Sequence, residues 1–217
     1  GIGWLYRKYG SGADSVRAFE IVTADGRVRR APADVEPELF WALRGAGAGH
    51  LGVVASVEVD LYPITELYAG SLFYAADTAG EVLRRWRDWI PTVPVDLTSA
   101  VALMNFPRLD DLPPELRGNS FVLVRGAFDG PSSEGERLMA HWCEWREPAL
   151  DAFGPLPFER VGEISQDTVE PMPFAITGSW VRALSDESLD ALIEHTFPPA
   201  SPPALLFAEV RHTGHRN

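Results

Sequence analysis

The stretch Leu39–Leu61, "LFWALRGAGAGHLGVVASVEVDL", places four glycines between an aromatic-rich helical run and a run of valines. Glycines leave backbone N–H groups accessible to a ligand and tolerate positive φ, which suits a phosphate or a flat heteroaromatic ring. A Rossmann fingerprint needs strand, glycines, helix, whereas the order here is helix, glycines, strand. A Walker A loop is also excluded, because no Gly-Lys-Ser/Thr follows. From spacing alone, a plain connector and a ligand-binding loop both stay open.

The segments around this stretch predict a hairpin, a helix and a long strand. Residues 15–32 alternate as paired strands do, with the turn at Asp25 and Gly26. A helix begins near Pro37 and turns three apolar residues inward: Leu39, Phe40 and Leu43. Apolar residues at every second position then predict a half-buried strand that Pro63 ends: Val53, Ala55, Val57, Val59 and Leu61.

From about residue 66 the pattern changes to strands at 69–77, 98–107, 120–130 and 203–214, with helices at 79–91, 133–150 and 185–197. Ser133 with Glu136 predicts a capping box, and Ser185 predicts an N-cap. The helical tryptophans are interpreted as packing between helix and sheet: Trp86, Trp89, Trp142 and Trp145. The fold class is therefore α+β, an antiparallel sheet with helices on one face, and the domains are predicted as residues 1–65 and 66–217.

Composition excludes several classes of partner. The 217-residue chain has a formal net charge of −12, which disfavours nucleic acid and anionic membranes. No stretch reaches the roughly 20 apolar residues of a membrane span. Cys143 is the one cysteine, so no internal disulfide is possible, and it is interpreted as a small core residue. The histidines lack metal-ligand spacing, so no metal is expected.

Three motifs carry a family resemblance: "GIGWLYRKYGSGADSV" from Gly1, the D-G hairpin with "ELFWALRGAG", and "GHLGVVASVEVDLYPI". Together they resemble, in one register from Gly1 to Pro63, the FAD-linked oxidases of the berberine bridge enzyme type, in the vanillyl-alcohol oxidase superfamily. Residues 66–217 resemble the family's substrate-binding domain more loosely, in "GPSSEGERLMAHW", "FGPLPFERV" and "FAEVRHTG". Departures include Ser15 where Asn is usual and "GAGAGHLG" where the family reads GGGGNFG.

The resemblance implies which residues approach FAD. Gly1 and Gly3 belong to the segment beside the flavin pyrophosphate and ribityl chain. The turn from Asp14 to Val16 contacts the adenine end through its backbone. Main-chain contacts to the adenosine part come from three residues: Gly52, Val53 and Val54. Arg211 and His212 lie on a strand that, in relatives, covers the flavin ring, so two interpretations stay open: one of them faces the substrate, or both lie on the surface of the sheet. No catalytic residue is assigned.

By the same resemblance, the intact enzyme is expected to oxidise a small organic substrate (an alcohol, a sugar or a secondary metabolite), passing hydride to flavin N5, with O₂ reoxidising the flavin. Residues 1–65 are expected to be a remnant of the PCMH-type FAD-binding domain. The chain is expected to be an inactive, cytoplasmic fragment without the N-terminal FAD subdomain and the C-terminal segment, and without bound FAD. The alternative is a non-catalytic α+β module that binds an anionic ligand. The oligomeric state is left open.

Overall fold

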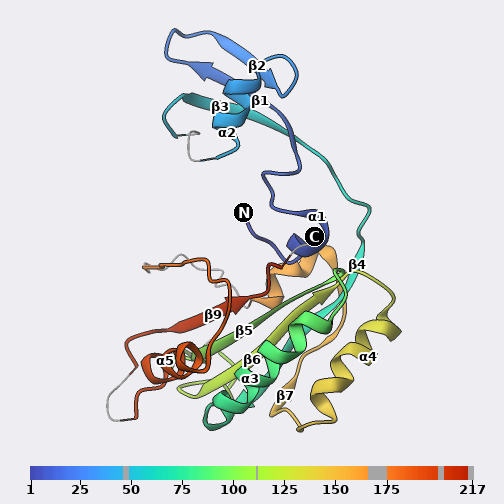
Figure 1. Ribbon diagram of the computed structural model, residues 1–217, viewed down its shortest axis with the longest axis vertical. Helices are drawn as coiled ribbons and strands as arrows, with labels where there is room; N and C mark the ends of the chain where they lie inside the picture. Colours follow the sequence, from blue (N-terminus) through green and yellow to red (C-terminus); the bar gives the residue numbers. More distant parts are fainter. Residues whose placement is uncertain (46–48, 111, 166–174, 200–202, 215–217) are drawn as a thin grey trace. The chain divides into compact units, whose positions relative to one another are not determined.

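The computed structural model describes residues 1–45, 49–110, 112–165, 175–199 and 203–214. The chain divides into two compact units, Gly1–Pro63 and Ile64–Asn217, each with its own sheet (Figure 1). This division falls two residues before the boundary that the sequence predicts. Among the described residues, no helix has the length and apolar character needed to cross a membrane.

The first unit is a three-stranded antiparallel sheet with the order β2-β1-β3, and two short helices. Its strands are β1 (Val16–Thr23), β2 (Val28–Pro32) and β3 (Gly52–Val59), and its helices are α1 (Tyr6–Tyr9) and α2 (Pro37–Leu43). The predicted hairpin is confirmed: Thr23 N–H donates to the Arg27 carbonyl at 3.0 Å across the turn, and Gly26 has a φ of 77°. A positive φ at this position is why the turn contains glycine.

A small core lies between α2 and the sheet. Phe40 and Leu43 are buried against Phe19 and Ile21, with Leu39 packed at the edge, so the predicted inward face of the helix is confirmed. Pro37 is in the first turn of the helix, as its fixed φ favours.

The prediction of a half-buried face on β3 is wrong. Val53 is 71% exposed and Leu61 88% exposed, and Val57 and Val59 are exposed as well, whereas Val54 packs on the core. A register shift pairs Ile21 with Val54 but Glu20 with Ser56, which breaks the two-residue period. In addition, a helix of seven residues is too short to cover a strand of eight.

The second unit is a larger antiparallel sheet with helices on one face (Figure 1). Its strand order is β7-β4-β6-β5-β9, and β8 pairs with the beginning of β4. The strands are β4 (Glu66–Ala75), β5 (Leu97–Asn105), β6 (Ser120–Phe128), β7 (Leu150–Asp151), β8 (Gly154–Pro157) and β9 (Phe207–Arg211). The helices are α3 (Ala79–Trp89), α4 (Ser132–Cys143) and α5 (Asp186–Thr196), with 3₁₀ turns at Ala76–Thr78, Ile90–Thr92 and Phe158–Ile164.

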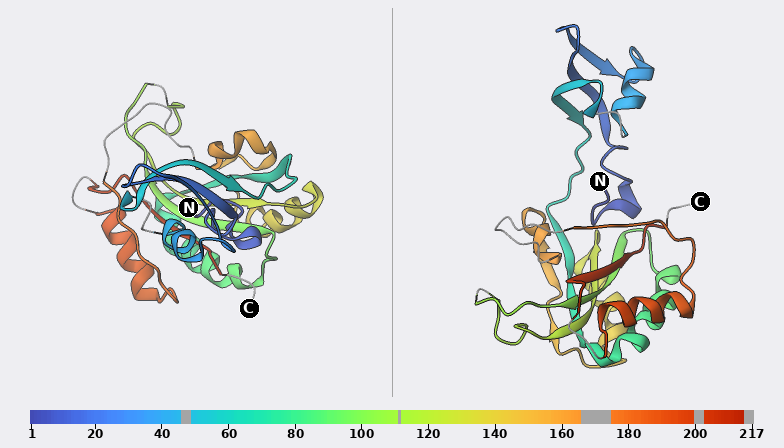
Figure 2. Two further views of the ribbon diagram at one scale, coloured as in Figure 1. Left: turned by 90° about the horizontal axis from the view of Figure 1, so that it is seen from above. Right: turned by 90° about the vertical axis from the view of Figure 1, so that its left-hand side faces the viewer.

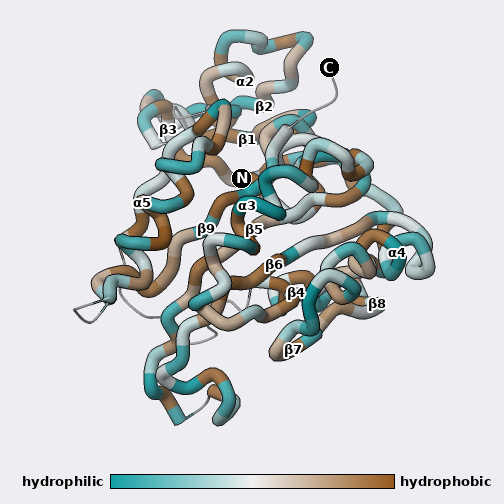
Figure 3. Tube along the Cα trace, turned by 60° about the horizontal axis from the view of Figure 1, so that its bottom comes forward, coloured by the Kyte–Doolittle hydropathy of each residue, from teal (hydrophilic) through white to brown (hydrophobic). Residues whose placement is uncertain are grey.

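The main core lies between these helices and the sheet. The central strands β4, β5 and β6 are mostly hydrophobic along their length (Figure 3). Helices α3 and α5 lie side by side on the same face (Figure 2), joined by an ion pair of 2.7 Å between Arg84 and Asp190. Trp86, Trp89 and Trp142 are buried in this core, as predicted, and Trp86 Nε1 donates to Ser99 Oγ at 2.9 Å. Trp145 is only partly buried.

Helix starts were predicted with mixed success. Ser185 caps α5, because its Oγ accepts a hydrogen bond from Ser188 N–H at 3.3 Å. The capping box from Ser133 and Glu136 is wrong: α4 begins at Ser132 after Pro131, and no side chain caps it. Ser133 is thus already inside the helix, where its hydroxyl cannot reach the orphan N–H groups of the first turn.

The interpretation of Cys143 as a core residue is also wrong. Cys143 is exposed at the end of α4, with its Sγ 3.8 Å from Asp151 Oδ2. Met139 and Trp142 are the buried residues of this helix. Because successive residues are about 100° apart around a helix, burial of Trp142 turns its neighbour away from the core.

The contact between α3 and α4 contains His141, and we expect it to weaken in acid. Its ring stacks on Trp89 with centroids 5.8 Å apart, and its Nδ1 is 3.4 Å from Arg85 Nη2. Burial and then the Arg85 charge lower the pKa of His141 below its usual 6.5, against a weaker opposing effect of Glu144. The contribution to stability is therefore complete above pH 6.5 and declines from there towards the lower pKa of the folded state.

We expect the melting temperature of wild type to fall over this acid range more steeply than that of His141→Asn, which has no group to protonate here. Thermal melts between neutral and acid pH measure both slopes. Equal slopes would show that His141 does not contribute to the loss of stability in acid.

Candidate functional site

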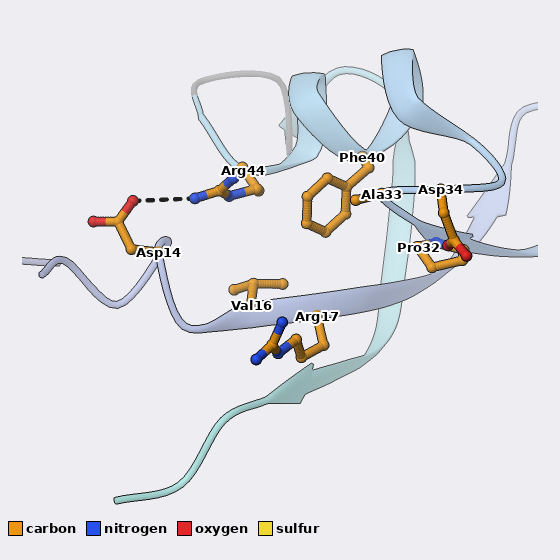
Figure 4. Close-up of a pocket in the computed structure, with 8 residues that line it drawn as sticks. All are labelled: Asp14, Val16, Arg17, Pro32, Ala33, Asp34, Phe40 and Arg44. Atoms are coloured by element: carbon orange, nitrogen blue, oxygen red, sulfur yellow. Dashed lines mark hydrogen bonds and ion pairs between the residues drawn. The ribbon is translucent and has the colours of Figure 1, made fainter. Parts of the chain in front are cut away.

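A cavity of about 400 Å³ lies between α2 and the beginning of β1 in the first unit. Figure 4 shows Val16 and Phe40 as its apolar walls, with charged side chains around them. The lining residues are Asp14, Val16, Arg17, Pro32, Ala33, Asp34, Phe40 and Arg44. Arg44 Nη2 forms an ion pair of 3.1 Å with Asp14 Oδ1, drawn as a dashed line, and its guanidinium lies 5.3 Å from the Phe40 ring.

Asp14 organises the loop that enters β1. Its Oδ2 accepts hydrogen bonds from Ser11 N–H at 2.8 Å and from Ser11 Oγ at 2.7 Å. Arg44 binds the other carboxylate oxygen and also donates to the Ala13 carbonyl at 2.9 Å. Both oxygens of Asp14 are therefore engaged within the chain, so this turn presents its backbone to a ligand. That arrangement fits the backbone role predicted for Asp14 to Val16.

A second cavity, of about 340 Å³, lies beside the glycines at the start of the chain. Its lining residues are Gly1, Ile2, Gly3, Leu5, Tyr6, Tyr9, Gly10, Ser11, Gly12, Ser15 and Tyr62. A Cβ added to Gly1 or Gly3 would meet no atom within 4 Å. The packing of this chain therefore does not require glycine at either position, and a side chain there would take up space beside the cavity. The hollow is open to solvent, and the glycines at its edge leave room there for part of a flavin cofactor.

Tyr62 closes one side of the second cavity. Its ring lies 4.0 Å from that of Tyr9, and its hydroxyl is 3.0 Å from Ser15 Oγ. Sequence analysis did not single out either tyrosine. The sequence signal for these tyrosines is weak, because Tyr62 and Ser15 are 47 positions apart and no local pattern links the two residues. Ser15, which departs from the usual Asn, makes its one described side-chain contact here.

The structure explains the glycine at position 52 by the packing of two strands, whereas the sequence predicted a contact with the cofactor. Its φ is +148°, and a Cβ there would lie 2.2 Å from the Val22 carbonyl oxygen. The close approach of β3 to β1 thus requires glycine whether or not a ligand is present. By contrast, Gly45 and Gly49 have no atom within 4 Å of an added Cβ, and Gly47 lies outside the described residues.

The predicted cofactor-binding residues fall into two groups along the sheet. Val16 pairs with Val59 at one end of β1, and Gly52 pairs with Thr23 at the other. Seven residues at roughly 3.3 Å each separate these ends by roughly 23 Å. Only a ligand that extends along the sheet contacts both groups. Val53 is well placed for main-chain contacts with such a ligand because its side chain is exposed, whereas Val54 packs on the core.

In the second unit, charged residues gather on the sheet face opposite α3, α4 and α5, beside the end of the 3₁₀ turn Phe158–Ile164. Arg125 of β6 and Arg211 of β9 both pair with Ala100 of β5, so they lie on the same face. Arg125 Nη1 is 3.0 Å from Glu209 Oε2, and Arg211 Nη2 is 2.7 Å from Glu209 Oε1. The side chain of Arg125 is 3% exposed, that of Glu209 18% and that of Arg211 21%. Arg125 also donates to the Ser165 carbonyl at 3.1 Å.

Of this cluster, sequence analysis singled out only Arg211. The available signal for Arg125 was a lone charge inside the apolar strand "FVLVRGAF", and Glu209 is the matching lone acid in "LLFAEV". His212 follows β9, and its backbone N–H donates to the Ser99 carbonyl at 2.8 Å. The structure thus places Arg211 and His212 next to each other at one end of β9.

The chain is similar to several known proteins, although no family model matches it. It is 26% identical over 204 residues to the uncharacterised FAD-linked oxidoreductase YgaK of Bacillus subtilis, a match covering 90% of this chain and 42% of that protein. It is 34% identical over 106 residues to the berberine bridge enzyme-like protein Cyn d 4 of Cynodon dactylon, covering 48% of this chain and 20% of that protein.

A solved structure has a similar fold. The crystal structure of 6-hydroxy-D-nicotine oxidase from Arthrobacter nicotinovorans aligns with a TM-score of 0.64 and 26% identity, over 78% of this chain and 36% of that one. This chain therefore spans less than half of the length of these relatives. Sequence and fold both resemble FAD-linked oxidoreductases of the berberine bridge enzyme type over part of their length.

Proposed function

We propose that this chain is part of an FAD-dependent oxidase, in which the first unit belongs to the PCMH-type FAD-binding domain and the second is the substrate-binding domain. When bound, FAD supplies the redox chemistry, accepting a hydride from a small organic substrate and returning electrons to O₂. The observation that carries the proposal is the match to an FAD-linked oxidoreductase over 90% of this chain, and the open hollow beside Gly1 and Gly3 is consistent with it.

The first unit's role is to bind and orient the cofactor. Gly1 and Gly3 keep the cavity open for the pyrophosphate and ribityl chain. The Asp14 carboxylate, held by Ser11 and Arg44, fixes the turn that offers backbone groups to the adenine end. The exposed edge at Gly52 and the two valines after it offers main-chain contacts to the adenosine part.

The second unit's role is to bind the substrate on the sheet face opposite α3, α4 and α5, at the β9 end, where the Arg211 side chain is 21% exposed. Arg211 is held in place by Glu209, and it stands at the end of β9 beside His212. Arg211 is the one of the two proposed to contact the substrate, because successive residues along an extended strand face opposite sides of a sheet and His212 follows it directly. An alcohol, a sugar or a secondary metabolite offers hydroxyl or carbonyl oxygens, which a guanidinium can bind by donating hydrogen bonds.

The proposal is tested by titrating the chain with FAD and following the quenching of flavin fluorescence. We expect wild type to bind added FAD saturably but too weakly to retain it through purification, and Gly3→Val to bind at least tenfold more weakly still, because a branched side chain would occupy cofactor space. The matched control is Gly178→Val, since an added Cβ there also meets no atom within 4 Å. Circular dichroism checks that all three proteins are folded.

Equal FAD affinity for wild type and Gly3→Val would overturn the proposed cavity. Saturable binding of inorganic phosphate by wild type, without any binding of FAD, would instead favour the alternative of an anion-binding module.

A further inference from the structure

Tyr62 joins the end of the first unit to the turn that enters β1. Its hydroxyl is 3.0 Å from Ser15 Oγ, and its ring centroid is 4.0 Å from that of Tyr9. The same side chain lines the second cavity, as do Ser15 and Tyr9. One residue therefore contacts both the cavity beside the first glycines and the turn from Asp14 to Val16.

The chain just before Tyr62 is fastened to the same turn. Asp60 N–H donates to the Ser15 carbonyl at 2.8 Å. The Asp60 carboxylate accepts a hydrogen bond from Arg17 Nε at 2.7 Å, and its other oxygen is 2.7 Å from Arg17 Nη2. These contacts bring the backbone of residues 60–62 beside Ser15, so that the Tyr62 hydroxyl reaches the Ser15 side chain.

Two distant parts of the chain thus restrain the turn. Arg44 holds Asp14 by an ion pair of 3.1 Å, and Tyr62 contacts Ser15, the next residue. A turn that binds a ligand through its backbone gains affinity when its groups are in place beforehand, because ordering a loose segment costs free energy. A side chain that restrains Ser15 therefore affects ligand binding without touching the ligand.

We propose that Tyr62 is a positioning residue for the cofactor. Acting through Ser15, it holds the turn from Asp14 to Val16 in the conformation that offers its backbone to the adenine end of FAD. The Tyr9 ring supports this role, because contact between the two rings restricts where the Tyr62 hydroxyl points. The inference rests on the proposed function, which assigns this turn to the adenine end.

The test is a double-mutant cycle in FAD affinity, measured by the quenching of flavin fluorescence. Tyr62→Phe keeps the ring beside Tyr9 and removes only the hydroxyl, and Ser15→Ala removes its partner. We expect each variant to bind FAD about threefold more weakly than wild type, as for the loss of one hydrogen bond. The double variant is expected to bind no more weakly than either single variant, because both changes remove the same contact.

Independent effects would instead multiply to about ninefold in the double variant. That result, or equal FAD affinity for Tyr62→Phe and wild type, would overturn the proposal. The matched control is Tyr68→Phe on β4, which removes a tyrosine hydroxyl from the second unit. It is expected to bind FAD as wild type does, and an equal loss of affinity in this control would also overturn the proposal.

Amide hydrogen exchange without FAD separates this inference from the proposed function. Val16 N–H donates to the Ala13 carbonyl at 3.3 Å, and Asp60 N–H donates to Ser15, so exchange at these two amides reports on the turn. We expect both to exchange faster in Tyr62→Phe than in wild type or Tyr68→Phe. If wild type binds no FAD, the proposed function fails, and exchange alone decides whether Tyr62 holds the turn. Unchanged exchange at both amides would overturn the inference in either case.

Discussion

Glu209→Gln is expected to destabilise the second unit by about 3 kcal/mol, because removing one partner of a buried ion pair leaves the other charge poorly compensated. Glu209 lies between two guanidiniums, with its Oε2 3.0 Å from Arg125 Nη1 and its Oε1 2.7 Å from Arg211 Nη2. The side chain of Arg125 is only 3% exposed, so little solvent is available to screen its charge. Urea unfolding followed by tryptophan fluorescence measures the loss.

The matched control for Glu209 is Glu81→Gln in the same unit. The Glu81 pair with Arg146 is as short, at 2.7 Å, but the Glu81 side chain is 62% exposed. Exposed pairs contribute little because water and salt screen them. We therefore expect only a small change in the urea midpoint for Glu81→Gln. Equal losses for the two variants would mean that burial does not determine the contribution of the Glu209 cluster.

Gly70→Ala is expected to disrupt the junction of β4 with the β7–β8 segment, at a cost on the order of 3 kcal/mol from strain and overpacking together. Gly70 has a φ of +153°, and a Cβ there would lie 2.2 Å from the Ala152 carbonyl oxygen and 2.7 Å from the Phe153 Cα. Neither contact can be relieved by rotating a side chain, because both atoms belong to the backbone. Thermal and urea unfolding of the variant measure the loss.

Gly154→Ala is the matched control for Gly70. Gly154 pairs with Ala69, next to Gly70 in the same ladder, yet an added Cβ there meets no atom within 4 Å. We expect its stability to stay close to that of wild type. A Gly70→Ala variant as stable as Gly154→Ala would show that the backbone of residues 152 and 153 moves easily, and that glycine is not needed at position 70.

Glycines show how far a sequence can be interpreted without coordinates. The run between residues 45 and 52 is one feature in the sequence, and it suggests one purpose. In the structure Gly52 is required by the approach of two strands, whereas Gly45 and Gly49 have open space beside them. Gly52 differs from the other two because it lies against Val22. Val22 is thirty residues earlier in the chain, so no local sequence pattern shows this contact.

The charged cluster on the second sheet illustrates the same limit. Arg125 and Glu209 are 84 positions apart, and each looked like an isolated charge in its own strand. Their contact depends on the strand order β6-β5-β9, which brings both strands beside β5. In the sequence, Arg211 is therefore indicated only by the family resemblance, and no local pattern indicates the two residues that hold it.

The sequence by itself determined the local features and the family resemblance. The turn at Gly26, the inward face of α2 and the cap at Ser185 all depend on residues within four positions of one another, so their physics is visible in a short window. The tertiary structure alone decided how much of β3 is buried, why Gly52 is glycine, and which charges meet on the second sheet. These depend on strand register and on helix coverage, which are set by contacts between distant segments.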